Sequence, residues 1–422
     1  MPNAKTKIKE LKAYEIINSS GQATLEIEVV ADSGKSARTA YPFDNFSTNF
    51  SAEMKNDNDK SRYGGKGCIA LVEQVNKILS PKVKGMDLFS QKELDQVLEE
   101  TKWENDKSLD VSIKYCFSIS CAKLSADLQN MDLYQYIIKT YKLKKLDSKK
   151  SVIPIFNIFN GGDTGDTDLD FQEFLLIPKK EDASEMIRKG AEVFLELAKV
   201  LREAGHDTDT GQEGGYAPDM DSSIEAIEFI LSAIIRAGYN PGKDFSLGID
   251  IGSSILYDKS TAKYVFSLDK SYFSALDLES LYQEWLSKYP ITYLEDVFNE
   301  SDWESWKKVN DSLGDRMQIV ADDLLSSNTN RLRESLNKNS FNSVILKPAK
   351  LGTLTKVVEY ANIAQEYGYK LLVSGLNQEL SDSHIADIAV ALGADSLKAG
   401  SLSRGERVVK YNRLIEIQNN LK

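Results

Sequence analysis

One repeated unit in the second half of the chain constrains the fold most strongly. In this unit, a short apolar segment ends in a polar or charged residue and a helical segment follows. Three successive apolar segments end at Asp322, Lys347 and Ser374, which lie 25 and 27 positions apart, a spacing that suits one strand plus one helix. Helical periodicity in residues 354–367 and 383–392 fills the gaps. Apolar segments of this kind occupy residues 245–250, 291–295, 317–322, 343–347, 370–374 and 396–398.

This alternation predicts an α/β fold in which residues 151–422 form a (β/α)8-type barrel. An open, doubly wound sheet is the structural alternative, but no glycine-rich G-x-G-x-x-G segment follows a predicted strand. In a barrel, the C-terminal ends of the strands meet at one mouth, where the active sites of this architecture lie. We therefore expect the polar strand ends to form a catalytic site.

The N-terminal part has a different pattern. Residues 11–41 alternate between apolar and polar side chains, with serine–glycine turns, which predicts an antiparallel meander. Helical spacing follows from residue 69 to residue 141. Strands followed by helices predict an N-terminal α+β domain over residues 1–141. The lysine-rich stretch 142–150 is then expected to be a solvated linker, because such charge runs are usually exposed.

Composition excludes several classes of function. The chain has 52 Lys and Arg residues against 64 Asp and Glu, and the net charge of −12 would repel a phosphate backbone, so no nucleic-acid partner is expected. No apolar run reaches the roughly 20 residues of a membrane-spanning helix. The polar N-terminus does not resemble a secretory signal, and we expect a cytoplasmic protein. Three cysteines without metal-ligand spacing are expected to be buried thiols.

Three predicted strands end in carboxylates, namely Asp250, Glu295 and Asp322. Three anions in one barrel mouth would repel one another unless a cation lies between them. Ligation by oxygen alone suits Mg²⁺, which binds a few carboxylates and keeps positions for water and substrate. The alternative is that each acid only caps the helix that follows. That reading suffices for one acid alone, but three successive strand ends favour a magnesium site.

Two later strands end in lysine, Lys347 and Lys398. Burial and a nearby cation would disfavour the charged amine and make Lys347 a usable base, whereas the alternative is that both lysines only neutralise the acids. Two further acids have unusual neighbours. Glu173 lies in Phe-Gln-Glu-Phe, and Glu213 is followed by two glycines that would let the backbone turn tightly and present the acid to a cleft. For each acid alone, an ordinary loop position is the alternative.

Together these residues resemble the enolase family. Its motifs are matched by Tyr63-Gly-Gly-Lys-Gly, Asn157-Ile-Phe-Asn-Gly-Gly, Phe171-Gln-Glu-Phe, Glu213-Gly-Gly-Tyr-Ala-Pro, Leu294-Glu-Asp-Val-Phe, Val320-Ala-Asp-Asp-Leu and Leu346-Lys-Pro-Ala-Lys. The resemblance implies that magnesium is held by the three strand-end acids and that Lys347 abstracts a proton. It further implies that Lys398 binds the substrate carboxylate, and that Glu213 and Glu173 assist departure of a hydroxyl group.

The chain departs from the family pattern at its phosphate-binding positions. Thr164 and Asn377 stand where enolases have a histidine and a serine, and both are candidate substrate-binding residues. Leu376 replaces the arginine that grips the substrate phosphate, and leucine offers no donor. Phe46 stands at the serine that binds a second magnesium ion, with Ser47 beside it.

The resemblance implies a magnesium-dependent hydro-lyase that acts on a small-molecule carboxylate. Its substrate is expected to be 2-phosphoglycerate, dehydrated to phosphoenolpyruvate in glycolysis, or a related hydroxy acid that undergoes the same α-proton abstraction and β-elimination. An enolase-like protein without turnover, acting as a binding or regulatory partner, is the alternative. A homodimer or higher homo-oligomer is the expected assembly, although Ser20 replaces the arginine of the family's usual dimer contact.

Overall fold

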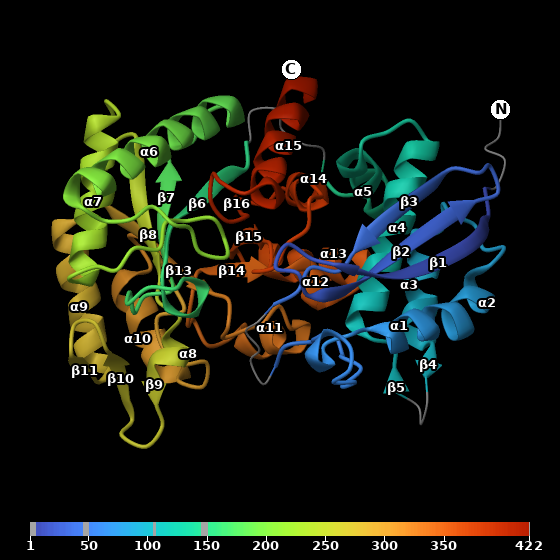
Figure 1. The fold of residues 1–422 in the computed structure, drawn as a ribbon, viewed down its shortest axis with the longest axis horizontal. Coiled ribbons are helices and arrows are strands. Elements are labelled where there is room, and N and C mark those ends of the chain that lie inside the picture. Colours follow the sequence, from blue (N-terminus) through green and yellow to red (C-terminus); the bar gives the residue numbers. More distant parts are fainter. Residues whose placement is uncertain (1–5, 45–49, 104–106, 145–150, 422) are drawn as a thin grey trace. The chain divides into compact units, whose positions relative to one another are not determined.

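The computed structural model describes residues 6–44, 50–103, 107–144 and 151–421, and its elements are labelled in Figure 1. Part of the predicted linker, residues 145–150, lies outside the described residues, as do Phe46 and Ser47. The chain divides into two compact units. The first consists of Met1–Asp147, Lys347–Asn362 and Gly375–Gly393, and the second of Ser148–Leu346, Ile363–Ser374 and Ala394–Lys422.

A three-stranded antiparallel sheet opens the first unit. Its strands are β1 (Ile8–Ile17), β2 (Ala23–Ala31) and β3 (Ser36–Ala40), in the order β1-β2-β3. Leu25 and Ile27 on β2 are fully buried, and helix α4 (Val111–Leu128) packs against β2 and β3. The predicted meander is therefore confirmed.

Helices complete the first unit. The longest of them, α4, is apolar on almost every side and begins where the Asp110 side chain accepts a hydrogen bond from the backbone N–H of Ser112, at 2.9 Å. The other elements of this unit are α1 (Ile69–Gln74), the π-helical turn η2 (Val75–Leu79), α2 (Ser80–Val83), α3 (Gln91–Glu100), β4 (Lys102–Trp103), β5 (Lys107–Ser108), α5 (Leu133–Tyr141), α12 (Pro348–Leu351) and α14 (His384–Leu392).

The second unit contains a closed eight-stranded barrel, in the order β12-β13-β14-β15-β16-β6-β7-β8. The six predicted strands are present with bounds that differ by at most one residue at either end, and the α/β fold with a barrel is confirmed. The strands are β6 (Ile153–Asn160), β7 (Glu173–Pro178), β8 (Phe245–Asp250), β12 (Ile291–Glu295), β13 (Gln318–Ala321), β14 (Ser343–Leu346), β15 (Lys370–Ser374) and β16 (Ser396–Lys398).

The predicted alternation of strand and helix fails at the start of the barrel. Strand β7 follows β6 directly and runs antiparallel to both β6 and β8. The connection contains only a short 3₁₀ turn, Gly162–Thr164, so no crossover helix returns the chain to the opposite end of the barrel. As a result, the first residue of β7, Glu173, lies at the same end as the last residue of β8, Asp250.

Helices follow the barrel strands, and a small antiparallel sheet interrupts the sequence after β8. Among the described residues, no helix is both long and apolar enough to cross a membrane. The remaining elements are α6 (Ala183–Ala204), α7 (Ser223–Arg236), α8 (Ser253–Leu256), β9 (Tyr257–Asp258), β10 (Lys263–Phe266), β11 (Ser271–Phe273), α9 (Ala275–Lys288), α10 (Trp303–Leu313), α11 (Thr329–Ser335), α13 (Leu354–Glu366) and α15 (Gly405–Leu421).

The barrel interior is a packed apolar core beneath the site. Buried side chains from six of its strands meet there, and tyrosine is the one polar type among them. The members are Ile155, Leu175, Ile177, Tyr293, Val320, Ile345 and Leu372. Outside the barrel, α6 packs against β6 through Gly190, where an added Cβ would lie 2.4 Å from Cε2 of the Phe156 ring. This glycine therefore sets how closely the helix approaches the strand.

We predict that Gly190→Ala destabilises the protein by about 1 kcal/mol. Overpacking costs roughly 1–3 kcal/mol, and the better helix propensity of alanine offsets roughly 1 kcal/mol of that cost. Gly405→Ala is the matched control, because nothing lies within 4 Å of its Cβ position. Urea unfolding measures both variants, and an unchanged midpoint for Gly190→Ala would contradict the close helix–strand contact.

Candidate active site

Three carboxylates stand in register on three neighbouring strands of the barrel. Asp250 at the end of β8 is paired with Glu173 on β7 and with Glu295 at the end of β12. All three side chains are buried, and Glu295 has no exposed surface. Inward-facing residues at matched positions on adjacent strands lie in one layer, so the pairing itself brings the acids together.

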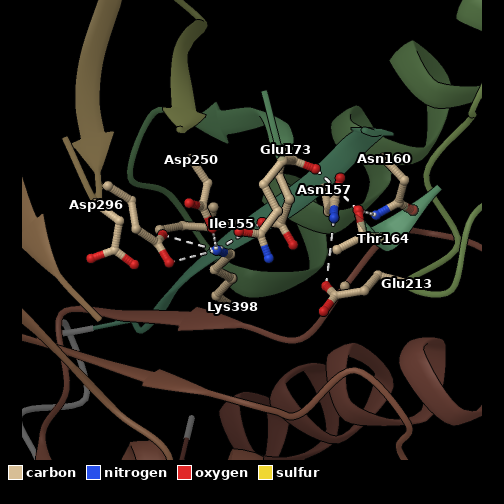
Figure 2. Close-up of polar contacts among 12 residues, drawn as sticks. Ile155, Asn157, Asn160, Thr164, Glu173, Glu213, Asp250, Asp296 and Lys398 are labelled. Carbon is tan, nitrogen blue, oxygen red and sulfur yellow. Dashed lines mark hydrogen bonds and ion pairs between the residues drawn. The ribbon is translucent and has the colours of Figure 1, made fainter. Parts of the chain in front are cut away.

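The ammonium group of Lys398 joins these acids from another strand, β16. Its Nζ atom lies 2.7 Å from Glu173 Oε2, 2.9 Å from Asp250 Oδ2 and 2.8 Å from Glu295 Oε2. In the barrel order, β16 is separated from β7 by one strand and from β12 by three, so the side chain reaches across the interior. Figure 2 shows Lys398 with its contacts to the acids dashed.

The surroundings hold Lys398 in its charged form. Burial alone would lower the pKa of its ammonium group, but the charges of Asp250, Glu173 and Glu295 together raise the pKa well above its usual value. An ammonium group that keeps its proton at neutral pH cannot accept one. Lys398 is therefore suited to an electrostatic role and unsuited to that of a general base.

One ammonium does not balance three carboxylates. Burial is the largest cause that raises the pKa of Glu295, and the charge of Asp250 adds to it. The pKa of Glu173 is also raised, by burial and by the charges of Glu213 and Asp250. Among the described residues, Asp250 Oδ1 is buried without a hydrogen-bond partner. A buried anion with an unsatisfied oxygen is a suitable ligand for an added cation.

Further carboxylates extend this cluster. Oxygen atoms of Asp250, Glu295 and Asp296 lie within 4.8 Å of one another, and so do oxygen atoms of Asp296, Asp322 and Asp323. Asp296 thus links the predicted ligands Asp250 and Glu295 to the third predicted ligand, Asp322. The donor set contains only oxygen atoms and fits Mg²⁺ in chemistry and charge.

Nothing in the sequence pattern singles out Asp296, because consecutive residues of a strand point to opposite faces. Its positive φ of 48° turns the side chain back toward the site. Both of its carboxylate oxygens accept backbone hydrogen bonds, from the N–H of Asp322 at 3.1 Å and of Asp323 at 2.9 and 3.1 Å. Asp296 therefore fixes the backbone that carries Asp322, and burial raises its pKa well above the usual range, with the charge of Asp323 adding to this shift.

Glu213 lies on a loop close to the same acids. The Nδ2 group of Asn157 on β6 lies 3.5 Å from Glu213 Oε2 (Figure 2). Gly214 adopts a φ of 87°, and an added Cβ would lie 2.7 Å from Ser403 Oγ. Glycine at this position is therefore required for the turn that follows Glu213.

Thr164 is fully buried, and its hydroxyl oxygen lies 2.7 Å from the carbonyl of Gly161 and 3.1 Å from that of Gln172. The hydroxyl also accepts a hydrogen bond from Asn160 Nδ2 at 3.1 Å. These contacts tie the β6–β7 connection to the end of β6. The role of Thr164 in substrate binding stays a prediction.

Lys347 and Asn377 belong to the other compact unit. Lys347 directly follows β14 and has an extended backbone before α12, whereas Asn377 lies three residues after β15. Leu376, beside it, is only 2% exposed, and its backbone N–H donates to Glu379 Oε1 at 2.8 Å. The catalytic role of Lys347 and the substrate contact of Asn377 stay predictions.

Two family models match the chain. Residues 8–137 match the enolase N-terminal domain, and residues 149–422 match the enolase C-terminal TIM barrel domain. The chain belongs to the enolase family. Membership supports an enolase-type lyase in general, and the acidic cluster is a group that could hold the metal ion typical of enolases.

A pocket of 490 Å³ lies beside the ends of β7 and β8 in this enolase-family barrel, and none of the clustered acids lines it. Gln172, which precedes Glu173, lines it, as do Ile251 and Gly252, which follow Asp250. Its polar side chains include Asp168 and Lys270. The pocket provides space for a small polar molecule next to the strands that carry the acids.

We predict that Asp250→Asn and Glu295→Gln each weaken magnesium binding at least about 100-fold. Loss of a residue that only supports a metal ligand already costs roughly 10–100-fold, and loss of a ligand should cost more. Glu284→Gln is the control, because it removes the same charge from an exposed position on α9. Isothermal calorimetry on the metal-free protein measures the affinities. Parental affinity in both site variants would show that the ligands are other residues.

Proposed function

We propose that the protein is a magnesium-dependent hydro-lyase that removes the proton alpha to a substrate carboxylate and expels a β-hydroxyl group. Its substrate is 2-phosphoglycerate or a related hydroxy acid. The observation that carries this proposal is the buried Lys398 ammonium, which contacts Glu173, Asp250 and Glu295 at the end of a closed barrel. With a divalent cation bound to the surplus carboxylates, such a buried site would suit chemistry that builds up negative charge on a substrate.

A proton beside an ionised carboxylate is a very weak acid, since its removal leaves two negative charges on neighbouring atoms. Asp250, Glu295 and Asp322 would hold magnesium, which supplies Lewis-acid stabilisation of that developing charge. Lys398 adds a fixed positive charge that needs no reorganisation during the reaction. Lys398 must keep its proton in this role, because the proton gives the side chain its positive charge.

Lys347 is the proposed base. Lys398 is excluded from this role because the neighbouring acids keep its ammonium group protonated. Lys347 follows β14 directly, at a strand end. Residues at the ends of barrel strands carry the chemistry in this architecture.

Glu173 is the proposed acid for the departing hydroxyl group. Burial raises its pKa well above the usual value although the charge of Lys398 opposes this shift, which is the direction that a proton donor needs. Glu213 assists from the neighbouring loop, where Asn157 contacts its carboxylate. The two acids thereby favour loss of hydroxide as water.

We predict that Lys347→Ala lowers exchange of the α-proton by about 10²- to 10⁴-fold, the usual contribution of a general base. The measurement is deuterium incorporation from D₂O into a panel of β-hydroxy acids, including 2-phosphoglycerate, with magnesium or with a chelator. Lys356→Ala is the control, because this half-exposed lysine on α13 pairs only with Glu99 among the described residues. Normal exchange in Lys347→Ala would assign the base elsewhere. No exchange into any acid by the parent protein would contradict the proposed reaction.

Leu376 stands at the position of the arginine that binds the substrate phosphate in enolases, and its side chain cannot donate a hydrogen bond to phosphate. We expect poor turnover of 2-phosphoglycerate, since losing one charged hydrogen bond costs about 1.5–3 kcal/mol, or roughly one to two powers of ten in affinity. The burial of Leu376 agrees with a packing role for this side chain.

We predict that Leu376→Arg increases kcat/KM for 2-phosphoglycerate about tenfold or more, by restoring a bidentate donor to phosphate. Leu376→Met, which is similar in size and uncharged, is the control and should leave kcat/KM unchanged. Thermal unfolding of each variant shows whether the buried position accepts the change. If the parent protein matched glycolytic enolases in kcat/KM for 2-phosphoglycerate, the claim that Leu376 limits phosphate binding would be wrong.

A further inference from the structure

A buried tyrosine contacts the acid cluster from the side of the barrel core. The hydroxyl group of Tyr293 on β12 donates a hydrogen bond to Glu295 Oε2. Tyr293 has no exposed surface and belongs to the apolar core of the barrel. Its burial raises the pKa of the phenol well above its usual value, and the charge of Glu295 adds to this effect, so the group remains a donor.

Strand pairing explains why the phenol reaches this acid. Tyr293 and Glu295 are two residues apart on β12 and face the same side of the strand. Across the ladder, Glu295 pairs with Asp250, and Tyr293 pairs with Gly248. An added Cβ at Gly248 would lie 3.0 Å from Tyr293 Cδ1 and 3.2 Å from Ile177 Cδ1. Because Gly248 has no side chain, the Tyr293 ring fits beside it, next to the layer of acids.

The two carboxylate oxygens of Glu295 therefore have different numbers of hydrogen-bond partners. Its Oε2 atom accepts from both Tyr293 and the Lys398 ammonium, at 2.8 Å from Nζ, whereas Oε1 contacts Lys398 at 2.9 Å. The phenol holds the carboxylate in one orientation and leaves Oε1 as the oxygen with the fewer partners. Glu295 thus offers one oxygen atom rather than two to a cation.

We propose that Tyr293 is a positioning residue that sets the metal selectivity of this site through Glu295. Mg²⁺ demands near-ideal octahedral geometry and takes carboxylates through single oxygens, whereas Ca²⁺ is larger and accepts bidentate carboxylates and irregular coordination. A carboxylate whose Oε2 atom accepts the additional Tyr293 hydrogen bond has Oε1 as the more available oxygen, and binding through one oxygen favours the smaller ion. The inference rests on the proposed metal site but not on the proposed reaction.

Tyr293→Phe tests this role, because it removes one hydroxyl group and keeps the ring that fills the barrel. The dissociation constants of Mg²⁺ and Ca²⁺ are measured by calorimetry on the metal-free full chain. We expect magnesium affinity to fall about 10- to 100-fold, the usual effect of losing a partner of a metal ligand. Calcium affinity should fall by less than about threefold, so the preference for magnesium over calcium decreases.

Tyr282→Phe is the matched control, since this buried phenol donates to the backbone carbonyl of Val297 and, among the described residues, has no hydrogen bond to the acids of the proposed metal site. It should keep both affinities. A Tyr293→Phe protein with parental affinities overturns the inference and leaves the proposed reaction standing. If the affinities for both ions fall equally in Tyr293→Phe, and fall by the same factor in Tyr282→Phe, the inference is also overturned. That result would mean that loss of either buried hydroxyl loosens the packing of the barrel. A selectivity change in a protein that exchanges no α-proton supports the inference and contradicts the reaction.

Discussion

The buried ion group of Lys398 and its three carboxylates is the interaction on which the site depends. Removing charges from water is costly, and a buried ammonium is tolerable only where anions surround it. Glu173, Asp250 and Glu295 meet this need but exceed it by two charges if all are ionised. Burial, and to a lesser extent the neighbouring carboxylate charges, raise the pKa of Glu173 and Glu295, and the excess of negative charge favours an added divalent cation. The burial of the acids and their capacity to hold a cation therefore both depend on one ammonium group.

Barrel geometry is what delivers these groups to one place. Matched pairing puts the acids of β7, β8 and β12 in a single layer, and the reversed direction of β7 brings Glu173 into it. A parallel β7 would carry its first residue to the opposite end of the barrel. The layer below contains Tyr293 over Gly248, so the packed core and the acid cluster meet in a direct hydrogen bond. The core of this barrel therefore supports the site as well as the fold.

Much of this organisation follows from local signals in the chain. The apolar segments that end in Asp250, Glu295 and Lys398 predicted their strands with the observed bounds, because burial on both faces leaves a continuous apolar run with a polar end. The meander of the first unit was predictable from its alternation. The proposed role of Lys347 is of another kind, because it depends on which groups lie near its amine. No local pattern reports a distance between groups that are far apart in the sequence.

The sequence by itself determined the α/β barrel, the family motifs and the identity of most of the acids. Only the tertiary structure decided that β7 runs antiparallel, that Lys398 contacts three carboxylates at once, and that Asp296 turns into the cluster with a positive φ. Likewise, the contact of Tyr293 with Glu295 depends on the absence of a side chain at Gly248, because the tyrosine ring lies where that side chain would be. The physical reason is the same in each case. Periodicity records which face of a strand is buried, whereas strand direction, register and backbone twist determine which buried groups meet.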